Sequence, residues 1–111
     1  MEPKTISIAK DFSAYPGGRF RDDGAHSGEA FREDILVPAL QESDHLIVDL
    51  DDTEGFGSSF LNEAFGGLVR QGHFTTEALH DRLSFVSEDT AYEKEIWGYI
   101  SQPSTSVSIE Q

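Results

Sequence analysis

A short apolar run that passes through a glycine-rich loop into an amphipathic helix constrains this chain more than any other feature. Residues 46–50, LIVDL, are mostly apolar without alternation, which is typical of a strand with both faces covered or nearly so. Gly55 and Gly57 permit a tight turn after the strand. A helix is then expected to begin at Ser58 or Ser59, because a serine hydroxyl can cap the free amides of a first helical turn.

The predicted helix has an apolar face and a polar face. The apolar side chains recur at the spacing of a core-facing stripe, and they are Phe60, Leu61, Ala64, Phe65, Leu68 and Val69. The opposite, exposed stripe comprises Asn62, Glu63, Gly66, Gly67 and Arg70. Each mid-helix glycine costs about 1 kcal/mol relative to alanine. The pair therefore indicates a flat surface for a partner, tight packing against a neighbouring strand, or simple tolerance.

Length and charge limit the class of protein. A chain of 111 residues suits one domain, which we expect to cover residues 1–102, with residues 103–111 as a disordered tail. The sequence has no cysteine and no apolar run of membrane-spanning length, so we expect a cytoplasmic protein without disulfides or a membrane segment. With 21 acidic and 8 basic side chains the net charge is −13, which argues against direct nucleic-acid binding.

The rest of the chain alternates predicted strands with predicted helices. Residues 5–12 predict the first strand, and the turn at Pro16 followed by a short strand around Phe20 predicts a hairpin. Later signals predict a helix capped by Ser27 that Pro38 kinks or ends, a helix over residues 76–83, a strand over residues 83–86 and a last helix opened by a capping box at Thr90. This order is typical of an α/β domain, with a mixed sheet because of the hairpin.

One glycine turn allows a second interpretation. Gly17, Gly18 and Arg19 could form an anion cradle from backbone amides and one guanidinium. No helix follows at the spacing of a phosphate-binding loop, so a plain hairpin turn is the alternative.

Carboxylates after the central strand suggest an enzyme as a competing hypothesis. Asp49 and Asp51 are spaced like the nucleophile and the acid/base of haloacid-dehalogenase-type phosphatases, which hold Mg²⁺. Such enzymes need a later lysine, and the only downstream lysine, Lys94, falls inside a predicted helix. A calcium loop starting at Asp52 would place Phe56 where an oxygen ligand is required. The four histidines lack metal-ligand spacing, so we predict no metal and no cofactor.

The chain resembles a family of STAS-like domains of unknown function, related to the STAS anti-sigma-factor antagonists. The longest matching block is residues 55–70, GFGSSFLNEAFGGLVR, and shorter blocks are DFS at 11–13, PGGR at 16–19, SGE at 27–29 with FR at 31–32, and VDLD at 48–51. The resemblance implies a STAS-like α/β fold, with a mixed sheet and helices packed mainly on one face.

STAS antagonists bind an ATPase related to histidine kinases, which phosphorylates a serine at the start of a helix. The resemblance therefore implies such an ATPase as the partner, with Ser58 as the phosphoacceptor and Ser59 as the following serine. Gly57 stands where the antagonists have aspartate and Phe60 where they have glycine. Ordinary helix capping is the alternative role of the two serines.

We therefore expect a non-catalytic regulatory module that binds a protein. The expected contact surface joins the loop to the polar stripe, and it comprises Thr53, Glu54, Gly55, Phe56, Gly57, Asn62, Glu63, Gly66, Gly67 and Arg70. Two other classes remain open, namely a Mg²⁺-dependent phosphatase-like enzyme using Asp49 and Asp51, and an acidic antitoxin or nucleic-acid mimic with a basic partner. The sequence predicts neither the oligomeric state nor the identity of the partner.

Overall fold

The computed structural model describes residues 3–101. The predicted tail, residues 103–111, lies outside the described residues. Within them, the strands β1 (Lys4–Ser7), β2 (Leu46–Asp49) and β3 (Leu83–Val86) form one parallel sheet in the order β1-β2-β3. The helical elements are α1 (Ile8–Asp11), η1 (Arg21–Asp23), α2 (Gly28–Phe31), η2 (Arg32–Leu36), α3 (Val37–Glu42), α4 (Ser58–Leu61), η3 (Asn62–Gly66), α5 (Gly67–Arg70), α6 (Thr76–Arg82) and α7 (Thr90–Ser101).

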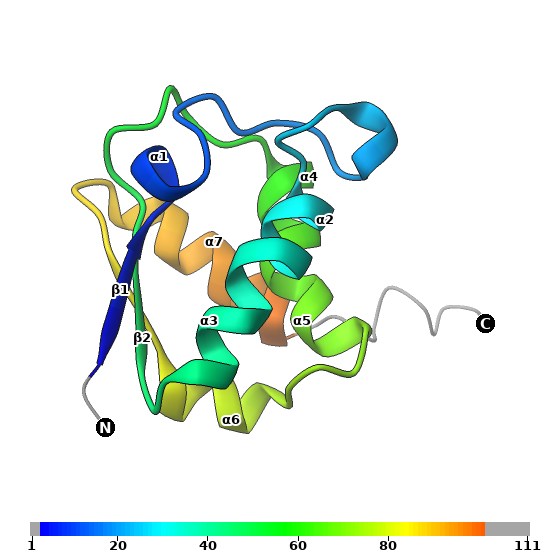
Figure 1. Cartoon of the computed structure of the whole chain (residues 1–111). Helices are drawn as coiled ribbons and strands as arrows, with labels where there is room; N and C mark the ends of the chain where they lie inside the picture. Colours follow the sequence, from blue (N-terminus) through cyan, green and yellow to red (C-terminus); the bar gives the residue numbers. More distant parts are fainter. Residues whose placement is uncertain (1–2, 102–111) are drawn as a thin grey trace.

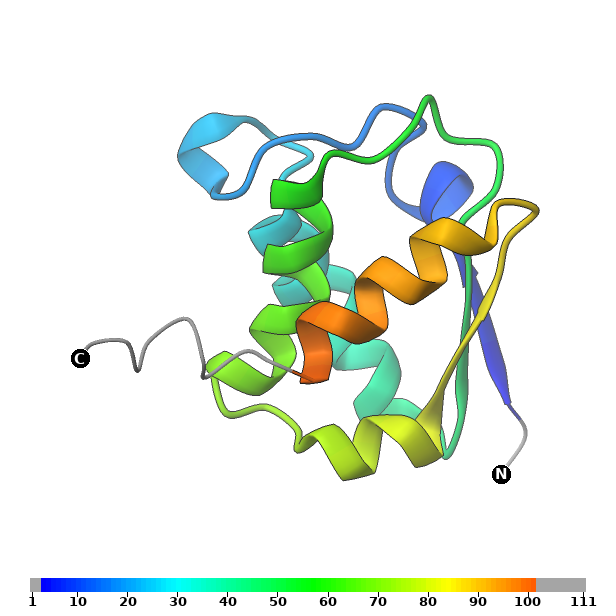
Figure 2. The same cartoon turned by 180° about the vertical axis from the view of Figure 1, so that it is seen from behind.

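The helices cover one face of the sheet (Figures 1 and 2). Ile6, Val48 and Phe85 are paired across the three strands, and Phe85 contacts the rings of Phe65 and Trp97. This row therefore faces the helices, while the neighbouring row, which includes half-buried Ile47, faces away from them. The expected packing of helices mainly on one face is confirmed. The central strand was expected to be covered on both faces or nearly so; the helices cover one face, and Ile47 on the other face is half-buried.

The predicted hairpin is also wrong, and the sheet is parallel where a mixed sheet was expected. Phe20 precedes the 3₁₀-helix η1, and the carboxylate of Asp23 accepts the amides of Arg19 (3.2 Å) and Phe20 (2.9 Å). This local carboxylate occupies the backbone donors that a second strand would use.

The first strand ends at Ser7, well before the predicted end at residue 12. The hydroxyl of Ser7 accepts the amide of Lys10 (3.2 Å), and the carboxylate of Asp11 accepts the amide of Ser7 (2.8 Å). These two reciprocal bonds cap the start of α1 and turn the chain away from the sheet.

Helix starts were predicted better than helix ends. Ser27 caps α2 as expected, because its hydroxyl accepts the amide of Ala30 (3.1 Å). Pro38 does not end the helix, which continues to Glu42. The wide π-helical turn η2 precedes Pro38 and leaves it in the first turn of α3, where a missing amide hydrogen is tolerated.

The last helix shows a smaller difference. It begins at Thr90 as predicted, but Asp89 supplies the cap, since its carboxylate accepts the amide of Ala91 (3.0 Å). Within residues 3–101, the structure contains no helix with the length and apolarity needed to span a membrane.

Replacing Gly98 in α7 by alanine is expected to stabilise the domain by about 0.5–1 kcal/mol, because alanine is the better helix former. A Cβ added at Gly98 would meet no atom within 4 Å, so nothing opposes this gain. The midpoint of urea unfolding should rise. An unchanged or lower midpoint would contradict the prediction.

Candidate functional site at the start of helix α4

Ser58 and Ser59 are the first two residues of α4, and both are exposed. Gly57 occupies the N-cap position, and it has no side chain with which to cap the helix. The prediction that one of the serines serves as the N-cap is therefore wrong, because the chain enters the helix one residue too early for it. Both hydroxyls face the surface without a capping role.

Tyr99 of α7 lies beside Ser58. The Tyr99 hydroxyl donates a hydrogen bond of 2.6 Å to the Glu95 carboxylate. Burial and this bond raise the pKa of Tyr99, whereas a hydrogen bond with Ser58 and the positive charge of Arg19 act in the opposite direction. Ser58 and Arg19, which come from two different parts of the chain, thus both lie near Tyr99.

The loop before α4 is fixed by a backbone hydrogen bond at Glu54 and by the packing of the Phe56 ring. The amide of Glu54 donates to the carbonyl of Ala14 (2.8 Å), and Gly55 adopts a φ of +126°, which favours glycine. Half-buried Phe56 packs its ring against Phe60 and Tyr92, with ring centroids 5.8 and 5.1 Å away. Of the loop residues predicted to contact a partner, Glu54 and Gly57 are exposed, Thr53, Gly55 and Phe56 are half-buried, and Phe56 packs onto the core.

The predicted exposed stripe is wrong at three positions. Glu63, Gly66 and Gly67 are buried, and only Asn62 and Arg70 are half-buried. Glu63 lies at the centre of what we call the arginine cluster, which consists of Arg19, Arg32 and Arg70.

The three guanidiniums of the arginine cluster bind Glu63 unequally. Arg32 is almost fully buried and donates to the Glu63 carboxylate at 2.7 Å. Arg19 and Arg70 lie farther from it, at 3.4 and 3.5 Å. Arg32 also donates to the carboxylate of Glu33 at 2.7 Å. This bond and the neighbouring His73 lower the pKa of Glu33, although partial burial opposes the effect.

Two arginines bind backbone carbonyls of the π-helical turn η3. In a π-helical turn each amide bonds five residues back, and the Gly67 amide accordingly donates to the carbonyl of Asn62. The carbonyl of Glu63 accepts Arg32 at 2.7 Å, and the carbonyl of Asn62 accepts Arg70 at 3.2 Å. Arg70 also donates to the Asn62 side chain at 2.7 Å.

The two adjacent glycines make room for these arginines. A Cβ at Gly67 would overlap the Arg32 guanidinium, and a Cβ at Gly66 would lie 2.8 Å from atoms of Arg70 and Asn62 and 3.3 Å from Tyr99. Neither a flat partner surface nor packing against a strand accounts for the pair. Because the two glycines lack side chains, they leave space for the side chains of Arg32 and Arg70 of the same protein.

The anion cradle predicted at Gly17, Gly18 and Arg19 is wrong in its backbone part. The amide of Gly17 donates to the carbonyl of His26 (2.9 Å), and the amide of Arg19 donates to Asp23. Two of the three backbone donors of the cradle, those of Gly17 and Arg19, are therefore engaged within the chain. The side chain of Arg19 does not form part of such a cradle; it pairs with Glu63 as a member of the arginine cluster.

The two carboxylates of the enzyme hypothesis make local contacts. Asp49 accepts the amide of Asp51 (2.9 Å), and Asp51 accepts the amide of Glu88 (2.9 Å). Over residues 3–101 there is no group of three or more histidine, aspartate or glutamate residues placed to hold a metal ion.

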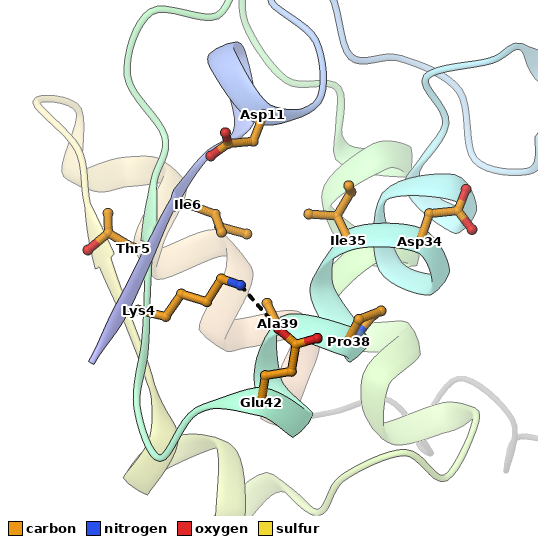
Figure 3. Close-up of a pocket in the computed structure, with 9 residues that line it drawn as sticks. All are labelled: Lys4, Thr5, Ile6, Asp11, Asp34, Ile35, Pro38, Ala39 and Glu42. Atoms are coloured by element: carbon orange, nitrogen blue, oxygen red, sulfur yellow. Dashed lines mark hydrogen bonds and ion pairs between the residues drawn. The ribbon is translucent and has the colours of Figure 1, made fainter. Parts of the chain in front are cut away.

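A surface pocket of about 360 Å³ lies away from this site, between β1 and the helix formed by η2 and α3 (Figure 3). Its charged lining groups are engaged within the chain. Lys4 pairs with Glu42 at 3.2 Å, Asp34 binds Arg21 through two 3.0 Å bonds, and Asp11 caps α1. We therefore assign no ligand to this pocket.

A family model described as a STAS-like domain of unknown function matches residues 27–93, which is more than half of the chain. The chain belongs to this family. The matched part of the STAS-like domain contains the start of α4, the turn η3, Arg32 and Glu63, whereas Arg19 lies before it. No curated protein and no solved structure gives a significant match to the chain.

Proposed function

We propose that this STAS-like domain is a non-catalytic regulatory module that binds a partner protein through the start of α4 and the exposed part of the preceding loop. The observation that carries the proposal is the exposure of Ser58 and Ser59 on a helix whose buried side is fixed by the arginine cluster. A rigid, accessible helix start of this kind suits recognition by another protein. The local engagement of Asp49 and Asp51 with backbone amides supports a role without catalysis.

The proposed regulation is phosphorylation of Ser58. A phosphate group would add a charge of about −2 at a surface that already carries exposed Asp52 and Glu54. A partner whose contact surface fits a neutral hydroxyl would then face a bulky, strongly hydrated phosphate that has no counterpart on the partner's own surface. From the family resemblance we propose an ATPase of the histidine-kinase superfamily as the partner and as the source of the phosphate.

Ser58→Asp is expected to weaken partner binding at least about tenfold, equivalent to about 1.4 kcal/mol, whereas Ser58→Ala keeps binding. The reason is that aspartate supplies negative charge at the contact, while alanine removes only a hydroxyl. The partner is first recovered by affinity purification of the tagged chain from its native cells, with mass spectrometry of the captured proteins and of Ser58 and Ser59. The affinities of the variants are then measured with the purified partner.

Thr90→Asp is the matched control, because Thr90 is also an exposed first residue of a helix. It should leave partner binding unchanged. Equal losses for Ser58→Asp and Ser58→Ala would contradict the switch, as would equal losses for Ser58→Asp and Thr90→Asp. Phosphatase activity that depends on Mg²⁺ and is lost in Asp49→Asn would overturn the non-catalytic proposal.

A further inference from the structure

Arg19 is the least engaged member of the arginine cluster. Its guanidinium offers five donors, yet within residues 3–101 its side chain makes one hydrogen bond, to Glu63 at 3.4 Å. A third of the side chain is exposed, compared with 4% for Arg32. The backbone of Arg19 is fixed, because its carbonyl accepts the amide of Glu29 at 3.0 Å. The side chain can therefore exchange partners without a movement of the loop.

The arginine cluster carries more positive than negative charge. Among residues 3–101, three guanidiniums share the single carboxylate of Glu63, and only Arg32 has a further acidic partner at contact distance, Glu33. Burial lowers the pKa of Arg70, and repulsion from Arg19 and Arg32 adds to this effect against the attraction of Glu63. A local positive excess in a chain of net charge −13 favours an anion at this place.

The positive excess lies next to the exposed serines. Ser59 precedes Glu63 by one helical turn, and Ser58 precedes Asn62 by one turn. Arg19 binds Glu63 and Arg70 binds Asn62, so each of these guanidiniums binds a residue that lies one helical turn beyond a serine. Ser58 and Arg19 both lie close enough to Tyr99 to act on its pKa in the downward direction.

We propose that Arg19, with Arg70 behind it, is a binding site for a phosphate group at the start of α4. Arg19 gives up its long bond to Glu63 and takes a bidentate, charge-assisted contact with the phosphate oxygens. Glu63 stays paired with Arg32 at 2.7 Å, so the exchange leaves no buried carboxylate unpaired. The phosphate comes either from phosphorylated Ser58, which rests on the proposed function, or from a phosphate or phosphomonoester outside the chain.

The first arm of the test uses the unmodified full chain and inorganic phosphate. The backbone amide signals of Ser58 and Ser59 are followed by NMR while phosphate is added at constant ionic strength. A source outside the chain predicts a saturable shift with a millimolar dissociation constant, lost in Arg19→Gln and kept in Arg21→Gln. Arg21 is the matched control because it lies in the same loop and pairs with Asp34 at the surface.

The second arm uses the chain with phosphoserine incorporated at position 58. Arg19 should lower the second pKa of this phosphate, measured by ³¹P NMR, by about 0.5 unit or more relative to the Arg19→Gln variant. Arg21→Gln should not change it, and Arg19→Lys should give an intermediate value, because lysine keeps the charge but lacks the planar fork. Far-UV circular dichroism checks that each variant is folded.

The two arms identify the source of the phosphate. A saturable, Arg19-dependent shift in the first arm assigns the site to a phosphate from outside, and an effect in the second arm alone assigns it to Ser58. Absence of any Arg19-dependent effect in both arms would overturn the phosphate site. A positive second arm combined with unchanged partner binding by the phosphorylated chain would instead refute the proposed function and leave the site standing.

Discussion

Arg32→Met is expected to lower the free energy of unfolding by about 3–5 kcal/mol, because it leaves the Glu63 carboxylate buried without its closest partner. Arg32 and Glu63 are 4% and 5% exposed, and their charged atoms are 2.7 Å apart. The same substitution removes the donor from the Glu63 carbonyl, which adds an unsatisfied backbone group. The loss would be measured as a lower midpoint of urea unfolding at neutral pH.

Arg21→Met is the control for this prediction, since Arg21 forms a bidentate pair with Asp34 at the surface. We expect it to cost less than about 1 kcal/mol, because exposed ion pairs contribute little. If Arg32→Met does not fold, Arg32→Lys keeps the charge and tests the same contact. A loss from Arg32→Met no larger than that from Arg21→Met would show that the buried pair does not stabilise the domain.

The continuous hydrophobic patterns of this chain were sufficient to predict its main elements. The strand at residues 46–49, the helix from 58 to 70, the helix at 76–82 and the strand at 83–86 lie where the sequence placed them. These segments combine an unbroken apolar pattern with a flanking glycine, serine or threonine, so the local signals agree with the burial in the fold. The STAS-like family was confirmed together with the α/β fold.

The sequence predictions failed where a nearby polar side chain binds the backbone amides that the predicted strand or hairpin would use. Residues 5–12 alternate like a strand, but the Ser7 hydroxyl accepts the Lys10 amide and the Asp11 carboxylate accepts the Ser7 amide, which ends the strand early. The turn at residues 16–18 resembles a hairpin, but Asp23 binds the amides that would pair. Short polar side chains at such positions stabilise several local structures, so periodicity alone does not choose between them.

The arginine cluster was missed because its members are far apart in the sequence. A signal was nevertheless present: Arg32 stands in the same helical stripe as the buried Leu36 and Leu40, at spacings of four. An arginine in a core-facing stripe needs an acidic partner and space for its guanidinium. Glu63 and Gly67 meet these two needs, but only the packing of α2 and η2 against η3 reveals the match.

The arginine cluster links the proposed function to the stability of the fold. Arg32 joins η2 to η3, Arg70 returns from the end of α5 to the start of η3, and Arg19 reaches the same carboxylate from the loop before α2. These contacts fix the buried side of the helix whose exposed start carries the serines. Only Arg19 has the exposure and the weak contact that allow it to respond to a new anion there.

Gly67→Ala is expected to lower the free energy of unfolding by about 3 kcal/mol, although alanine is the better helix former. Its Cβ would overlap the Arg32 guanidinium, which has no other place to go because it is buried and binds Glu63 on both its carboxylate and its carbonyl. The new methyl group must therefore separate the buried pair or displace η3. Urea unfolding of the two proteins under identical conditions measures the difference.

Gly66→Ala is the control for this prediction, because it introduces alanine at the adjacent helix position without a clash with Arg32. Gly66→Ala meets the flexible ends of Arg70 and Asn62, which are half-buried and can move toward solvent, so we expect a change within about 1 kcal/mol. Combining Gly67→Ala with Arg32→Met should cost less than the sum of the two single losses, because each change disrupts the same contact. Additive losses would mean that Gly67 is required for a reason other than space for Arg32.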